Sequence, residues 1–215
     1  MQSFLAPDGP AMRFITRICF SVWLNVLWFV CCIPIITIGP ATTALFYCCQ
    51  KLVLDEEGYV TKAFFHSFKE NFRQSTVVGL IMTGIGILFG VDGFILYHLK
   101  GESVFWALLT AIFLVAVAAY VIVAMYIFPL MARFANDTIS MFRNSLMIGM
   151  RFLLCTAFMA AVYFLMALIV VRFFTPAIIF GIGTCALLNS MLLKNILIQC
   201  EIAQETDTAA ENDIE

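Results

Sequence analysis

The sequence predicts an all-α fold: a polytopic transmembrane helical bundle of five to six membrane segments with two cytoplasmic amphipathic elbow helices. Its 215 residues are 63% hydrophobic and 12% charged, with 22 Phe, whereas soluble domains are about 25% charged. Long apolar runs follow one another along the chain and lack the alternating pattern of a barrel strand. Because a helix satisfies its backbone hydrogen bonds within one segment, these runs are expected to cross the bilayer as helices.

The chain divides into three predicted parts. Residues 1–17 form an interfacial N-terminal segment, in which Arg13 and Arg17 accompany apolar side chains and face the lipid phosphates. Residues 18–200 form one membrane domain. Residues 201–215 carry six acidic side chains and are expected to be a disordered, solvated tail.

The first membrane stretch, residues 18–50, contains no charged residue over 33 positions. One crossing takes about 20 residues, so this length is long for one helix and barely enough for two. Pro34 and Pro40 lie near its midpoint, where a turn would need them. We therefore expect a helical hairpin of segments 18–34 and 38–54. The alternative is one span followed by a surface or re-entrant helix, which gives five spans and an external N-terminus.

Four further membrane segments and two connecting elbows complete the predicted domain. In the first elbow, phenylalanines recur at helical spacing while charged side chains fill the other faces. This pattern is typical of an amphipathic helix that lies along a membrane surface. The four segments are residues 76–97, 103–130, 152–171 and 173–197, and the elbows are residues 55–75 and 133–149.

A short internal repeat relates the two elbows. Residues 72–75, Phe-Arg-Gln-Ser, are echoed by residues 142–145, Phe-Arg-Asn-Ser, at an offset of 70. Such an echo also arises by chance in a Phe-rich chain. The same offset places residues 40–54 opposite residues 110–124, which lie within a clear membrane run. If the repeat is real, it favours the hairpin and six segments over five.

The basic residues set the predicted orientation. Eight lie on the side of the elbows and the C-terminus, and two lie on the other side. Because cytoplasmic loops carry an excess of Lys and Arg, the elbows and both termini are expected to be cytoplasmic. The eight are Lys51, Lys62, Lys69, Arg73, Arg133, Arg143, Arg151 and Lys194, and the two are Lys100 and Arg172.

The first hairpin also carries a family motif, for which a structural role is expected. The motif residues are Asn25, Trp28, Pro34, Thr37, Gly39, Pro40, Ala41 and Thr42, and similar residues continue through Lys51, Asp55, Phe65, Phe68, Asn71, Phe72, Gln74 and Ser75. In these positions the chain resembles the YesL-like family of small bacterial integral membrane proteins, whose domain has no assigned function. The resemblance implies a place in the bacterial cytoplasmic membrane. It also implies an accessory role in sugar uptake, because family members tend to be encoded beside ABC-type sugar importers. No catalytic or ligand-binding residue is implied.

One acidic residue, Asp92, lies inside a predicted span, and an intramembrane ionisable residue is a functional candidate by default. In the six-segment topology Asp92 is near the outer membrane face, as is Arg172 between the last two spans. We expect the two to form an intramembrane ion pair. The alternative is that Asp92 is a substrate or proton site.

Other polar and sulfur-containing residues at membrane depth are expected to pack rather than react. Interhelical hydrogen bonds are the main interpretation for Asn25, Thr37, Thr42, Thr43, Asn189 and Ser190, and a polar passage is the alternative. The pairs at residues 31–32 and 48–49 suggest a soft-metal site. However, adjacent cysteines on a helix point about 100° apart, so one pair chelates poorly. No metal or cofactor site is predicted.

The first elbow is a candidate partner-docking surface. Exposed, basic, Phe-rich helices bind either a lipid surface or a protein, as the coupling helices of ABC permeases bind their ATPase. The lipid surface is the simpler expectation. The docking residues would be Phe65, Phe68, Lys69, Phe72 and Arg73.

The predicted function is a non-enzymatic accessory or assembly partner in carbohydrate uptake, with the lipid bilayer, ABC sugar-transporter subunits or a second copy as partners. The alternative is a small transporter or channel that acts on its own as an oligomer. A membrane enzyme is disfavoured because the sequence contains no hydrolase, zinc-protease or P-loop motif. The sequence has no basic patch suited to nucleic acid.

Overall fold

The computed structural model describes residues 10–54, 56, 59–99, 104–134, 137–172 and 177–212. Throughout these ranges the secondary structure is helical, without a strand, so the all-α prediction is confirmed. The elements are α1 (Pro10–Cys31), the 3₁₀ turn η1 (Ile35–Thr37), α2 (Ile38–Leu54), α3 (Val60–Glu70), α4 (Phe72–Leu99), α5 (Val104–Met131), α6 (Thr138–Arg151), α7 (Leu153–Arg172) and α8 (Ala177–Asn212).

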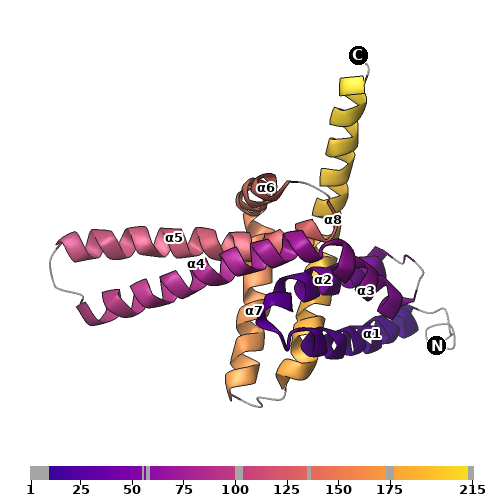
Figure 1. Ribbon diagram of the computed structural model, residues 1–215, viewed down its shortest axis with the longest axis horizontal. Coiled ribbons are helices and arrows are strands. Elements are labelled where there is room, and N and C mark those ends of the chain that lie inside the picture. Colours follow the sequence, from indigo (N-terminus) through magenta and orange to yellow (C-terminus); the bar gives the residue numbers. More distant parts are fainter. Residues whose placement is uncertain are drawn as a thin grey trace.

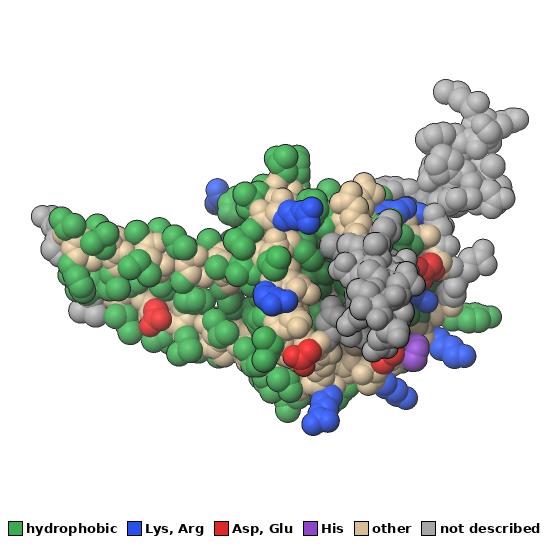
Figure 2. Space-filling view, turned by 90° about the horizontal axis from the view of Figure 1, so that it is seen from above, with side chains coloured by type: hydrophobic (Ala, Val, Ile, Leu, Met, Phe, Trp, Pro, Cys, Tyr) green, Lys and Arg blue, Asp and Glu red, His purple; other side chains and the backbone are tan. Residues whose placement is uncertain are grey.

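The helices form a compact body with one long projection (Figure 1). The hairpin of α4 and α5, here called the arm, extends from one side of the body, and α1, α2 and α3 lie on the other side. Helices α7 and α8 run across the direction of the arm, and α6 lies over the base of the arm. Figure 2 shows Lys and Arg side chains gathered on the body, whereas the arm is almost entirely hydrophobic.

Four of the described helical stretches are long and apolar enough to cross a membrane: Phe72–His98, Val104–Met131, Leu153–Arg172 and Gly181–Gln199. In the first three helices, only 11%, 6% and 11% of an 18-residue apolar stretch is buried inside the protein, so most of their surface is free for lipid. The fourth buries 56% and is the central one of the four. These features define a multi-pass membrane fold, as the composition predicts. The count of six segments stays a prediction, because α2 and the apolar part of α1 (Ile15–Cys31) are shorter.

The centre of the body is α2. Eleven of its 17 residues are buried, and it packs against α1, α3, α4, α5 and α8. One apolar cluster joins α2 to α1, α3 and α8, and a second joins the base of the arm to α6, α7 and α8. The middle of α8 therefore bridges both clusters.

The helices at the two ends of the described chain are longer than the predicted spans. Helix α1 runs without interruption from Pro10, so residues 10–17 form its first turns, and their interfacial position stays a prediction. Helix α8 continues to Asn212, whereas a disordered tail is expected from residue 201. Residues 201–212 contain neither Gly nor Pro, and half of them are Ala or Glu, which are strong helix formers. Charge density alone was therefore a poor guide to disorder here.

The internal repeat exists at a different offset from the predicted one. The order of apolar, amphipathic and apolar helix occurs twice, as α2–α3–α4 and as α5–α6–α7. However, residues 72–75 begin α4, whereas residues 142–145 lie in the middle of α6, so the offset of 70 pairs unlike positions. The starts of α4 and α7 are 81 positions apart. The predicted elbow 55–75 is likewise divided at Asn71, after which α4 begins.

A pair of buried hydroxyl contacts supports this new offset. In the first half, Thr43 Oγ1 of α2 lies 3.0 Å from Ser75 Oγ of α4. In the second half, Tyr126 Oη of α5 lies 2.9 Å from Thr156 Oγ1 of α7. Ser75 and Thr156 are also 81 positions apart and occupy the first turn of their helices. Each half thus joins its two apolar helices by one hydroxyl–hydroxyl hydrogen bond.

Candidate functional site

The family motif builds the turn between α1 and α2. The Thr37 hydroxyl lies 2.5 Å from the Cys31 carbonyl oxygen and 2.6 Å from that of Pro34, and the first of these carbonyl groups lies at the end of α1, where helical N–H partners run out. Trp28 Nε1 donates a hydrogen bond of 3.1 Å to Thr42 Oγ1 across the two helices. The hairpin predicted from the sequence is thus present as a helix–turn–helix structure.

The same motif brings α4 against α2. A Cβ atom on Gly39 would clash with the carbonyl group of Ser75, and the nearest further atom would be Gly79 Cα. Only a glycine at position 39 allows this approach of the two backbones. Pro40 sits in the first turn of α2, where no helical partner for an N–H is needed, and Ala41 is fully buried beside it.

Asn25 extends the motif to α8. Its Oδ1 accepts a hydrogen bond of 3.2 Å from the Gly183 backbone N–H. A Cβ atom on Gly183 would clash with the Ser21 carbonyl oxygen, so α1 and α8 are also in close backbone contact. The motif residues therefore hold α1, α2, α4 and α8 together, and their placement indicates an architectural role.

The structure does not bring Asp92 and Arg172 together. Asp92 lies exposed on the arm, and Arg172 is the last residue of α7. The salt bridges between described residues do not include this pair. The reason is the direction of the helices: α4 leaves the body across the direction of α7 (Figure 1). Lys100 lies outside the described residues.

Helix α3 is fixed on the body by its buried face. Phe64 and Ser67 are buried against α2, and Trp23 Nε1 of α1 donates a hydrogen bond of 3.0 Å to Thr61 Oγ1. The rings of Phe64 and Phe68 stack with their centroids 6.4 Å apart, and the Phe68 and Phe72 rings are 5.6 Å apart. This aromatic row continues from α3 across the break into α4.

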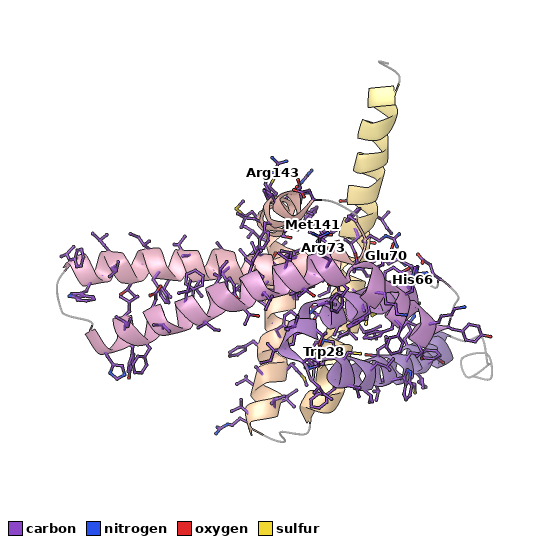
Figure 3. All side chains as sticks on the ribbon, viewed as in Figure 1. Trp28, His66, Glu70, Arg73, Met141 and Arg143 are labelled. Atoms are coloured by element: carbon purple, nitrogen blue, oxygen red, sulfur yellow. The ribbon has the colours of Figure 1, made fainter. Side chains whose placement is uncertain are left out.

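The outer face of this corner carries the candidate docking residues. Phe65 is 42% exposed and Phe72 is 39% exposed, and Lys69 and Arg73 are exposed beside them. Phe68 is half-buried and supports the others from below. Figure 3 shows Arg73 and Arg143 on the upper side of the body, on α4 and α6, with Trp28 below them. We call the four exposed residues the α3–α4 corner.

One polar junction was not identified from the sequence. Gln50 of α2 is buried, and its Nε2 donates a hydrogen bond of 2.8 Å to the Pro129 carbonyl oxygen near the end of α5. Glu56 then bridges Lys51 at 3.6 Å and Arg133 at 3.3 Å. In the sequence, Gln50 stands out as a polar residue at the end of an uncharged run. Its partner Pro129 is 79 positions away and could not be identified from the sequence.

Apolar helices with lipid-accessible surfaces, joined by buried hydrogen bonds between hydroxyl and amide groups, define the chain as a multi-pass helical membrane protein. Residues 21–93, from α1 to the outer part of α4, match the family described as "Protein of unknown function, DUF624". The predicted resemblance to the YesL-like family is thereby confirmed, and it covers the motif hairpin and the α3–α4 corner.

A curated relative extends the similarity beyond that region. The chain is 27% identical over 180 residues to the uncharacterized protein YteU of Bacillus subtilis (strain 168), which covers 81% of this chain and 76% of the relative. No solved structure matches the chain.

Proposed function

We propose that the protein is a non-enzymatic accessory or assembly partner in ABC-type carbohydrate uptake, in the bacterial cytoplasmic membrane. The resemblance to the YesL-like family supplies the link to sugar uptake. The observation that carries the proposal is the α3–α4 corner, where exposed aromatic rings and two cations lie on a rigid base. A rigid surface of this kind binds a partner with little loss of conformational entropy.

The proposed topology has six membrane segments, with both termini and the amphipathic helices α3 and α6 in the cytoplasm. Its support is the position of the cations. The topology assigns three of these cations to the cytoplasm. They lie near the C-terminal ends of α2, α5 and the apolar part of α8: Lys51, Arg133 and Lys194. The first two share Glu56, and the last two line one pocket. The C-terminal ends of these three apolar stretches therefore lie close together, as the topology requires.

The arm must turn to fit this topology. Membrane helices tilt by about 0–40° from the bilayer normal, whereas the arm runs across α7 and α8 (Figure 1). We infer that the arm pivots about its base so that α4 and α5 cross the same bilayer as α7 and α8. The sparse burial of the arm helices is consistent with such a movement.

The docking proposal is tested by charge reversal at the corner. The variant Lys69→Glu with Arg73→Glu is compared with Arg143→Glu, an exposed cation of α6. After affinity purification from native membranes, the wild type and Arg143→Glu should co-purify with ABC-transporter subunits, and the double variant should lose them. Equal recovery from the corner variant, with equal amounts of protein in the membrane, would exclude the corner as the docking surface.

A transporter or channel is the second candidate, because several buried polar atoms lack a hydrogen bond. They include Ser21 Oγ and Ser190 Oγ, and polar groups inside a membrane domain line solute pathways in many transporters. Reconstitution of the purified protein alone into liposomes tests this candidate. Uptake of a labelled sugar or ion by the lone protein would favour transport over the accessory role.

A further inference from the structure

A small pocket lies between the C-terminal ends of α2 and α5 and the middle of α8. Its polar lining comes from Gln50 of α2, from Arg133 just after α5, and from Ser190 and Lys194 of α8, and its other walls are aliphatic side chains of α2 and α8. Ser190 and Lys194 are four positions apart, so they lie on one face of α8 about 6 Å apart along the axis. The lining thus combines aliphatic side chains with two cations, Arg133 and Lys194, and two polar residues, Gln50 and Ser190.

Two deeply buried side chains in this pocket have unused hydrogen-bonding atoms. Gln50 is only 3% exposed, and its Oε1 has no partner although its Nε2 caps α5. Ser190 is 1% exposed, and its Oγ also has no partner. Buried polar atoms are normally paired, and each exception calls for an explanation. Here one acceptor and one hydroxyl remain unused in the same pocket.

The two cations of the pocket differ in their partners. Arg133 is held in place by Glu56 at 3.3 Å. Lys194 takes part in none of the salt bridges between described residues, although it stands one turn beyond Ser190 beside apolar walls. An ammonium group in this position favours an anionic oxygen atom as its partner.

We propose that this pocket binds the headgroup of an anionic phospholipid with free hydroxyl groups, of the phosphatidylglycerol class. Lys194 and Arg133 hold the phosphate, and a headgroup hydroxyl enters the interior to meet Gln50 Oε1 and Ser190 Oγ. The interior space of about 10 Å³ admits about one water molecule, and therefore one hydroxyl group. The acyl chains lie along the aliphatic walls, as for lipid sites between membrane helices. This proposal is independent of the docking surface at the α3–α4 corner.

Lipid retention by the full-length protein in nanodiscs tests the proposal. Native mass spectrometry compares phosphatidylglycerol with phosphatidylcholine, which is zwitterionic, and with phosphatidylmethanol, which is anionic but has no headgroup hydroxyl. The wild type should retain phosphatidylglycerol about tenfold over phosphatidylcholine and several-fold over phosphatidylmethanol. Lys194→Gln should abolish the first preference, and Ser190→Ala should reduce the second.

The serine variant also separates binding from folding. Because Ser190 Oγ has no hydrogen bond, Ser190→Ala should leave the lipid-free protein as thermostable as the wild type or more so. Ser75→Ala is the matched control, because it removes a hydroxyl that is hydrogen-bonded to Thr43. It should lower the Tm and leave the lipid preference unchanged.

Three results would overturn the proposal. Equal retention of the three lipids would mean that water alone fills the interior. An unchanged preference in Lys194→Gln would mean that the lipid binds elsewhere. Displacement of phosphatidylglycerol by millimolar inorganic phosphate or glycerol 3-phosphate would mean that the site takes a free phosphate instead of a lipid.

Discussion

Helices α2 and α5 hold equivalent places in the two halves of the chain, yet their surroundings are opposite. Helix α2 buries 11 of 17 residues. Helix α5 has 28 residues and is the most hydropathic of the candidate spans, but its buried residues lie only between Met125 and Met131. In this protein, the helix with the highest hydropathy, α5, is therefore the one most exposed to lipid, and the less apolar helix α2 forms the core.

Polar and small residues explain this difference. Helix α2 carries Gly39, Thr43 and Gln50, which contact α4 and α5 through a backbone approach and two hydrogen bonds. In a bilayer, apolar surface gains little by leaving lipid for protein, so small residues and hydrogen bonds determine which helices pack. Helix α5 has such features mainly at its buried end, at Tyr126 and Pro129, and once further out, where the Tyr120 hydroxyl donates a hydrogen bond of 2.9 Å to the Met82 carbonyl oxygen of α4.

The largest expected contrast comes from leucine truncation in the two helices. Leu45→Ala in α2 removes a fully buried side chain and should lower the free energy of unfolding by about 2–5 kcal/mol. Leu108 of α5 is 60% exposed on the arm, so Leu108→Ala should change it by less than about 0.5 kcal/mol. Denaturation in detergent measures both variants. Similar losses would mean that the arm is covered by protein in the native membrane.

A second contrast concerns the glycines where α2 meets α4. Gly39→Ala places a methyl group against the Ser75 carbonyl, which should cost about 3 kcal/mol because backbone atoms must move. Gly84→Ala on α4 is the control, since no atom lies within 4 Å of the new methyl group. The control should fold and express as well as the wild type. Equal expression of Gly39→Ala would contradict the close approach of the two helices.

Much of the fold could be predicted from the apolar runs. Residues 38–54 coincide with α2, and the spans predicted at 103–130 and 152–171 differ from α5 and α7 by one residue at each end. The turn was identifiable because Pro34 and Pro40 interrupt an otherwise uniform run. Hydrophobic pattern, together with helix-breaking residues, contains this local information.

Contacts between distant helices could not be predicted in the same way. Nothing in the sequence pairs Gln50 with Pro129 or turns α4 away from Arg172, because hydropathy is nearly uniform around each span. The sequence repeat rests on four similar residues, 72–75 and 142–145. In the structure, Ser75 instead corresponds to Thr156, because each makes the hydroxyl–hydroxyl hydrogen bond of its half. Of the five predicted docking residues, the four of the α3–α4 corner are exposed and Phe68 is half-buried; their role in docking stays a prediction.

The smallest expected effect tests this equivalence of the halves. Double-mutant cycles combine Thr43→Val with Ser75→Ala, and Tyr126→Phe with Thr156→Val. Each pair should show a coupling of about 0.6–1.7 kcal/mol, the range for hydrogen bonds between membrane helices. Thermal denaturation in one detergent measures both cycles. If the stability losses of the two single variants simply add in one cycle, the hydrogen bond of that half does not stabilise the protein, and the two halves are not equivalent.

The central claim is the six-segment topology, and cysteine accessibility in intact cells tests it most directly. In a background that lacks the eight native cysteines, single cysteines replace Ile36 in the first turn, His98 at the tip of the arm and Lys69 on α3, all of which are exposed. An impermeant thiol reagent should label positions 36 and 98 from outside, and position 69 only after the membrane is opened. Labelling of position 36 only from the cytoplasmic side would contradict the hairpin crossing and favour five spans.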